Sequence, residues 1–159
     1  MSGLITISHT IPAAQKGLTA LARKIGTIDP ALKTIGHALE ANIRERWDQE
    51  IDPEGNRWAP LKASTIKRKI KKRKPLKILL QDDQLRYTIS SQVDDGTLIV
   101  GSPQKYAAVH QLGGPAGRKG KQDEADILDE IEMPARPFLG ISKQDEADIL
   151  DEIELHLKL

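Results

Sequence analysis

A stripe of large apolar side chains between residues 30 and 50 most strongly constrains how this chain can fold. Its members recur at spacings of three and four residues: Leu32, Ile35, Leu39, Ile43 and Trp47. That spacing places them on one face of an α-helix. Asp29 is a good N-cap residue, and Pro30 suits the first helical position. The pattern predicts a long amphipathic helix from about Pro30 to Glu50.

Two shorter patterns precede this helix. Residues Leu4 to Ser8 alternate in a strand-like manner with β-branched side chains, which predicts an opening strand. Between Pro12 and Gly26, apolar residues recur at helical spacing and predict a short first helix. The chain is therefore expected to begin with a strand and two helices, the second of them long.

The block from Asp52 to Trp58 combines Pro, Gly and Asn, which predicts a turn that returns Trp58 to the body of the protein as a packing anchor. Its acidic residues do not match a calcium-binding EF-hand loop. Such a loop needs glycine at its sixth position, and that position counted from Asp52 is Arg57. A structural turn is the favoured interpretation.

A change to strand periodicity follows the lysine-rich segment. Leu85, Tyr87, Ile89 and Val93 alternate with polar residues and predict one strand. Asp94-Asp95-Gly96 predicts a turn, and Thr97 to Gly101 a second strand, so an antiparallel hairpin is expected. Tyr106 to Leu112 predicts a short helix or turn, closed by Gly113-Gly114.

The string KQDEADILDEIE occurs twice, at residues 121–132 and 143–154. Ser142 and Asp145 form a capping box before the second copy, which predicts a docking helix from Lys143 to His156. Its apolar stripe is Ile149, Leu150, Ile153 and Leu157. The first copy lies in an acidic segment, 117–133, interpreted as an insertion that prefers a short exposed helix. A passive insertion is favoured over an acidic contact with a neighbouring subunit's basic arm, because an exposed acidic helix stays soluble alone.

The length of the chain indicates one domain spanning residues 1–159, and the order of the predicted elements makes it α+β. The chain is expected to be made in a reducing cytoplasm. The chain has no cysteine, which excludes disulfides and thiolate metal sites. Its apolar runs are far shorter than the roughly 20 residues of a membrane-spanning helix, and no signal-peptide pattern is present, so no membrane partner is expected. The net charge of +1 hides a strong segregation, since the arm at 62–77 carries nine of 24 basic residues and the two repeats carry twelve of 23 acids.

The basic arm predicts a helix from Ala63 to Lys74 that begins near Ser64 or Thr65 and ends before Pro75. Its candidate contacts to DNA or to a partner are Lys67, Arg68, Lys69, Lys71, Lys72, Arg73 and Lys74. Clustered cations favour binding to phosphate. The arm lacks the aromatic residues that stack on bases, so a solvated or disordered loop that awaits a partner is the favoured interpretation.

The sequence contains few features that are typical of an enzyme. His110 has no second histidine at metal-binding spacing, so a structural role is favoured for it. The chain contains no nucleophile-elbow, P-loop or dinucleotide-binding motif. The sequence therefore predicts no catalytic, metal or cofactor site, and no enzyme.

The strings DPEGNRW, ILLQDDQLRYTI, TLIVGS, YAAVHQLGG and PARPFLGIS, in this order, resemble the phage virion-morphogenesis family, also called tail-completion proteins. The resemblance covers the chain from about Leu4 to its end. It implies a non-catalytic structural protein that completes the tail or forms a ring at the head–tail connection, the neck. The implied partners are further copies of the chain, expected as a hexamer, other neck and tail proteins, and DNA in the channel. The implied location is the virion, after synthesis in the host cytoplasm.

The family motifs also supply candidate assembly residues. They are Trp58, Tyr106, His110, Gln111, Arg136 and Phe138. Pro134 and Pro137 restrict the backbone around Arg136, which favours an extended segment with a fixed guanidinium. Two interpretations of Arg136 are equally supported: an internal salt bridge in a final strand, and a carboxylate contact at a subunit interface. The alternative function is nucleic-acid binding through the basic arm.

Overall fold

The apolar stripe at residues 32–47 is buried along one long helix, α2 (Asp29–Gln49), which confirms the predicted helix. The computed structural model describes residues 5–6, 15, 18–19, 28–81, 83–116 and 131–158. Ile28, rather than Asp29, is the N-cap, and no side chain caps the helix. Asp29 instead lies in the first turn, where its charge interacts favourably with the helix dipole.

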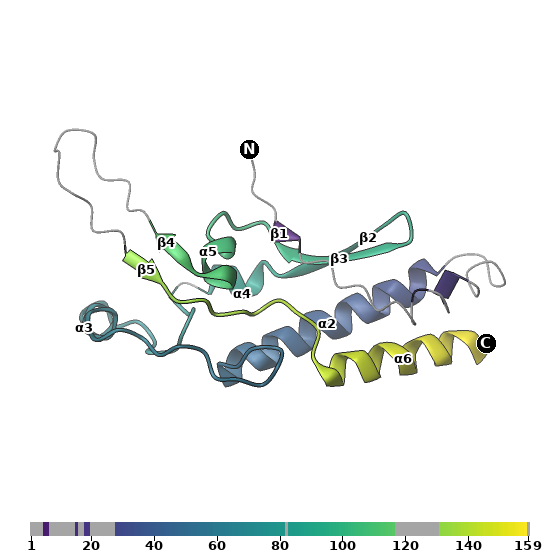
Figure 1. Ribbon diagram of the computed structural model, residues 1–159, viewed down its shortest axis with the longest axis horizontal. Coiled ribbons are helices and arrows are strands. Elements are labelled where there is room, and N and C mark those ends of the chain that lie inside the picture. The colour runs from purple at the N-terminus through teal and green to yellow at the C-terminus, as the bar shows by residue number, and fades with distance from the viewer. Residues whose placement is uncertain are drawn as a thin grey trace.

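The remaining elements give an α+β fold of antiparallel strands and helices, as expected (Figure 1). They are β1 (Ile5–Thr6), α3 (Ala63–Lys71), α4 (Gln84–Tyr87), β2 (Ser90–Asp94), β3 (Thr97–Ser102), α5 (Ala107–Leu112), β4 (Gly114–Ala116), β5 (Ile131–Met133) and α6 (Lys143–Lys158). Of the predicted short first helix, Gln15, Leu18 and Thr19 are helical, and the rest lies outside the described residues.

A three-stranded antiparallel sheet of order β1-β3-β2 packs against α2. The β2–β3 hairpin runs in register from Ser90 opposite Gly101 to Asp94 opposite Thr97. Its close approach to the helix depends on Gly36, because a Cβ atom there would lie 2.6 Å from the Ser91 Oγ. Glycine at this helical position therefore sets the spacing of sheet and helix.

The first hairpin strand begins at Ser90, so its predicted start at Leu85 was wrong. Residues Gln84–Tyr87 form the helical turn α4, which buries Leu85 in the core. Arg86 pairs with Asp48 of α2 at 2.7 Å, and the Thr88 Oγ donates a hydrogen bond to the Gln84 carbonyl at 2.8 Å. These tertiary and capping contacts favour a helical turn over the alternating pattern.

The start of β2 is held by Glu40 of α2. The Glu40 Oε1 accepts hydrogen bonds from both the backbone N–H and the hydroxyl of Ser91, each at 2.6 Å. Arg44 donates to the Glu40 Oε2 and to the Ile89 carbonyl, each at 3.0 Å. Burial by itself would raise the pKa of Glu40, but the Ser91 hydrogen bonds and Arg44 together lower it below its ordinary value of 4.5.

This pKa shift gives the protein an acid-sensitive contribution to stability. Below about pH 4.5 the unfolded chain binds more protons at this position than the folded chain, so the free energy of unfolding falls as the pH falls. We expect Glu40→Gln to have a lower free energy of unfolding than wild type at about pH 7. The difference between the two proteins should be smaller at about pH 3.5. Urea denaturation of both proteins across this range measures the difference. A stability difference that stays constant across that range would contradict the prediction.

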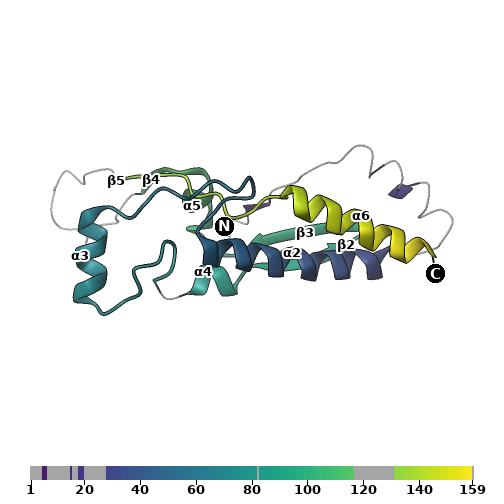
Figure 2. The same ribbon diagram turned by 90° about the horizontal axis from the view of Figure 1, so that it is seen from below.

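Helix α6 begins with the predicted capping box. The Ser142 N–H donates to the Asp145 Oδ2 at 2.7 Å, and the Asp145 N–H donates to the Ser142 Oγ at 3.1 Å. The helix then runs antiparallel along α2 (Figure 2), so that its first turn lies by Arg46 and Leu155 lies near Thr34.

Helix α6 docks on α2 through polar contacts, and the predicted apolar stripe is only partly buried. Asp145 is fully buried and pairs with Arg46 at 2.7 Å, and Asn42 donates to both Asp145 and Asp148. Ile149 and Ile153 are half-buried, whereas 51% of Leu150 is exposed. Leu157 has no described side chain.

The two repeats end in different structures. Ile131 and Glu132 lie in β5, where they pair with Ala116 and Pro115 of β4, whereas the equivalent Ile153 and Glu154 lie in α6. The expected insertion 117–133 therefore contains a strand at its end. Its residues 117–130 lie outside the described ranges.

Candidate functional site

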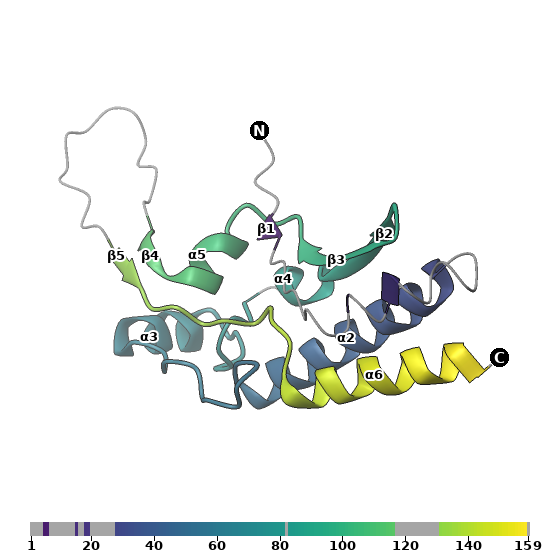
Figure 3. The same cartoon turned by 45° about the vertical axis from the view of Figure 1, so that its right-hand side comes forward.

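The segment between β5 and α6 passes between α5 and α3, as Figure 3 shows, and it carries two of the expected site residues. Phe138 is only 2% exposed and packs against Trp47, with ring centroids 4.9 Å apart. Trp58 meets Trp47 edge-on at 5.4 Å, and its Nε1 donates to the Pro137 carbonyl at 2.8 Å. Phe138 and Trp58 are interior residues, which confirms Trp58 as the predicted packing anchor and corrects the expectation that these two side chains form an assembly surface.

Trp58 reaches the core because the preceding turn is internally hydrogen-bonded, as predicted. The Asp52 Oδ1 accepts hydrogen bonds from the backbone N–H groups of Glu54 and Asn56, at 2.9 and 2.8 Å. The Trp58 N–H then donates to the Glu50 carbonyl at 2.9 Å. The acidic side chain therefore organises its own loop.

Gln111 joins α5 to the same segment. Its Oε1 accepts hydrogen bonds from the backbone N–H groups of Phe138 and Leu139, and its Nε2 donates to the Leu139 carbonyl, all at 3.0 Å. The side chain is buried. Gln111 is thus an internal clamp on an irregular backbone, which corrects its expected role at an exposed interface.

Arg136 does not form the internal salt bridge in a final strand that was one of its two expected arrangements, and the other, a carboxylate contact at a subunit interface, stays a prediction. Its segment is not a strand, and within the described residues its buried guanidinium forms no ion pair. The Nε donates to the Ala59 carbonyl at 2.9 Å, and one terminal nitrogen donates to the Pro60 carbonyl at 3.2 Å. The Arg136 N–H donates to the His110 carbonyl at 2.7 Å. Arg136 therefore ties the loop before α3 to the segment before α6.

The basic arm is a protruding, ordered helix and not a disordered loop. Helix α3 starts after Lys62 and ends at Lys71, earlier than the predicted Lys74. Arg73 has φ of 51°, a left-handed conformation that is incompatible with continuing the helix. The residues of the arm with exposed side chains include Lys67, Arg68, Lys71, Lys72 and Arg73.

Lys69 is the exception in this cationic helix. It is 5% exposed, and its ammonium donates to the carbonyls of Pro75, Lys77 and Leu80 at 2.9, 2.7 and 2.6 Å. Burial, and secondarily the charge of Arg68, lower the pKa of Lys69. Its inclusion among the DNA or partner contacts was wrong, because the ammonium is committed to holding the returning loop.

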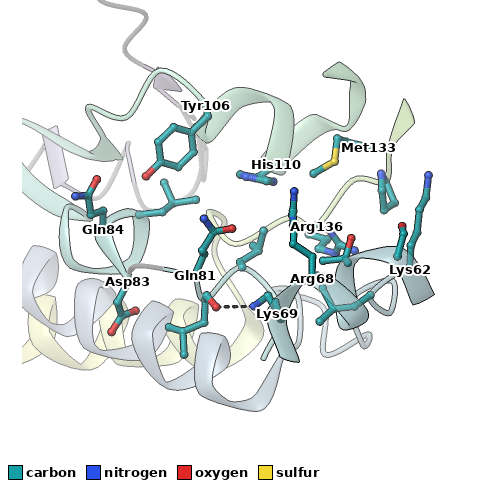
Figure 4. Close-up of a pocket in the computed structure, with 17 residues that line it drawn as sticks. Lys62, Arg68, Lys69, Gln81, Asp83, Gln84, Tyr106, His110, Met133 and Arg136 are labelled. Carbon is teal, nitrogen blue, oxygen red and sulfur yellow. Dashed lines mark hydrogen bonds between the residues drawn. The ribbon is translucent and has the colours of Figure 1, made fainter. Parts of the chain in front are cut away.

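A pocket of about 630 Å³ lies where α3, α5 and the residues after β5 meet (Figure 4). Lys62 and Arg68 lie at one end, and Asp83 and Gln84 lie at the other. Much of the lining is apolar and includes Leu61, Leu79, Leu80, Leu85 and Met133. These apolar lining residues were not anticipated as site residues, although the run LKILL at residues 76–80 was a visible signal.

Tyr106 and His110 of the expected site do line this pocket, together with Arg136. The Tyr106 and His110 rings meet edge-on, with centroids 5.9 Å apart. Burial, and then the charge of Arg136, lower the pKa of His110, so the imidazole is neutral at neutral pH. The structure thus divides the six expected residues into three pocket residues and three interior ones.

Two further properties concern the part of the chain that the structure describes. There, no group of three or more acidic or histidine side chains is arranged to hold a metal ion. No helix in these ranges combines the length and hydropathy needed to cross a membrane. The distinctive surface features of the described residues are a cationic helix and the mixed pocket beside it, and a cationic surface is typical of proteins that contact other macromolecules.

Comparison with known proteins identifies the kind of structural protein. The chain belongs to the phage virion morphogenesis family, which it matches over residues 10–158. It is 32% identical to "Mu-like prophage FluMu G protein 2" of Haemophilus influenzae, over 72% of this chain and 83% of that relative. No solved structure matches it significantly. The resemblance drawn from the motifs is confirmed, and the chain is a virion-associated phage structural protein with a role in assembly.

Proposed function

We propose that this protein completes the phage tail by forming a homo-oligomeric ring at the head–tail connection, without catalysing a reaction. The observation that carries the proposal is the placement of large apolar side chains on the outside of a family member. They are Ile70, Leu76, Tyr87, Tyr106, Leu112, Leu150 and Leu155. Contiguous exposed apolar patches mark protein–protein interfaces, and these side chains would contribute to such patches in an assembled ring.

The proposed partners are other copies of the chain, expected as a hexamer, and the neighbouring neck and tail proteins. The residues of the family motifs build the interior of the chain. Trp58, Gln111 and Phe138 hold the core together and leave the helices α3, α5 and α6 to present the outer surface. The protein would be made in the host cytoplasm and retained at the neck of the finished virion.

Removing the gene from a prophage that encodes this protein tests the proposal. We expect induced lysates to contain heads and tails that fail to join, or tails of abnormal length, under the electron microscope. Supplying the wild-type protein should restore joined particles and place antibody label at the neck. Label confined to another part of the virion, or normal particles without the protein, would contradict the proposal.

The ordered cationic helix supports a second candidate function, binding of nucleic acid. Lys67 and Lys71 of α3, and Lys72 just after it, have exposed side chains and are free of the structural role that Lys69 has. A variant with these three lysines changed to glutamine should then bind duplex DNA more weakly, with a shallower dependence on salt. Strong, steeply salt-dependent binding by the wild type that the variant loses, together with normal particle assembly by the variant, would favour this function over the ring.

A further inference from the structure

We propose that α3 of one copy docks on α6 of the next copy, in a head-to-tail contact between oppositely charged helices. This inference rests on the proposed ring and names the surfaces that would close it. The two helices mark opposite ends of an elongated molecule: α3 lies at one end of the long axis, and the last turns of α6 lie at the other (Figures 1, 2 and 3).

The charges of the two ends are complementary. The arm at residues 62–77 contains no acidic residue and eight basic residues besides the internally bonded Lys69. Helix α6 contains two lysines and five acidic residues besides the buried Asp145, which pairs with Arg46. Complementary potentials steer association and fix the register of an interface.

The exposed faces of the two helices also match in shape and polarity. On α3 the exposed face carries Ala63, Lys67, Ile70 and Lys71. On α6 it carries Ala147, Leu150, Asp151, Glu154 and Leu155. Each face therefore has one small residue that permits close approach, at least one branched apolar side chain, and charges beside it.

The branched apolar residues of each face remain largely exposed within their own chain. Ile70 is 60% exposed, and Leu150 and Leu155 are 51% and 57% exposed. Burying them against one another would add an apolar core to the charged contact.

The direction of the contact follows from the charges. Pairing α3 with α3, or α6 with α6, would bring like charges together, so the charges favour α3 of one copy against α6 of another. A contact between different surfaces at opposite ends repeats from copy to copy and closes into a ring when the rotation allows it. The occupant of the α3 face is therefore another copy of this chain.

Charge reversal on the two faces provides the test. One variant carries Lys67→Glu and Lys71→Glu, and the other carries Ala147→Lys and Asp151→Lys. We expect each variant alone to dissociate at least about tenfold more readily than wild type, because both of its contact faces then have the same sign. An equimolar mixture should recover the oligomer, since the acidic α3 face of one variant meets the basic α6 face of the other. Combining all four changes in one chain should also recover it.

Native mass spectrometry and sedimentation velocity measure the oligomers, and circular dichroism checks that each variant is folded. Lys105→Glu, a reversal at an exposed lysine of neither helix, should assemble like wild type. Folded variants that assemble normally by themselves, or a mixture that fails to recover, would overturn the α3–α6 contact while leaving the ring intact. A wild-type protein that stays monomeric at high concentration, even with isolated tails, would overturn the ring and this contact together.

Discussion

Replacing Phe138 with alanine should lower the free energy of unfolding by about 3–5 kcal/mol. Phe138 is the only phenylalanine of a chain poor in aromatic residues, it is 2% exposed, and it packs on Trp47. Its removal leaves a cavity between α2 and the segment before α6, where the Gln111 clamp restricts the backbone from closing in. Urea denaturation followed by circular dichroism measures the loss.

Two control variants distinguish the loss of core packing from the general effect of shortening an aromatic side chain. Phe138→Leu keeps much of the side-chain volume and should cost less than the alanine variant. Tyr87→Ala removes an exposed ring and should change the stability by no more than about 0.5 kcal/mol. A loss at Phe138→Ala as small as that at Tyr87→Ala would show that the aromatic core is not assembled as described.

Asp145→Ala should cost about 3–5 kcal/mol, because it removes one partner of a buried ion pair. The Asp145 side chain is fully buried, and that of Arg46 is 11% exposed. The same carboxylate accepts hydrogen bonds from Asn42 and from the Ser142 N–H that begins α6. The substitution therefore breaks the helix cap and the contact between α6 and α2 at once.

The duplication supplies a matched control for this variant. Asp123 occupies the same place in the first copy of KQDEADILDEIE and lies outside the described residues. Because Arg46 and Ser142 are already paired with Asp145, Asp123→Ala should leave most of the stability intact. Equal losses at the two positions, measured by urea denaturation, would contradict the role assigned to Asp145.

Elements with strong local signals were predicted well. Helix α2 follows from an unbroken apolar stripe, and α6 follows from a capping box that satisfies its own backbone. The turn before Trp58 was equally predictable, because Asp52 hydrogen-bonds its own loop. In each case the stabilising groups lie within a few residues of one another, so a short window of sequence contains the explanation.

Elements decided by distant partners were not predictable. Leu85 to Tyr87 alternate like a strand, yet Asp48 of α2 pairs with Arg86 and holds a helical turn there. Nothing near Lys69 in sequence distinguishes it from the other lysines of its arm. Only the fold brings three backbone carbonyls of the returning loop to its ammonium.

The candidate site was also predicted only in part, because the burial of its residues depends on contacts that are distant in sequence. The motifs singled out Trp58, Gln111 and Phe138 as important, but of these only Trp58, expected as a packing anchor, was also assigned to the interior. The structure places these three in the interior and leaves Tyr106 and His110 at the pocket. A motif records that a residue matters, whereas its exposure depends on what the rest of the chain packs against it.

By itself, the sequence determined the long helix, the cap of the last helix, the segregation of charge and the family resemblance, because each depends on neighbouring residues or on order along the chain. The tertiary structure decided which charged residues are internal and which ends of the molecule carry opposite charge. It also decided the secondary structure of identical residues. Ile131-Glu132 pairs with β4 as a strand, whereas Ile153-Glu154 continues a helix that starts at its own cap and is anchored on Arg46. Backbone hydrogen bonds to a distant strand outweigh a helical preference worth only a fraction of a kcal/mol per residue, roughly 0–0.7.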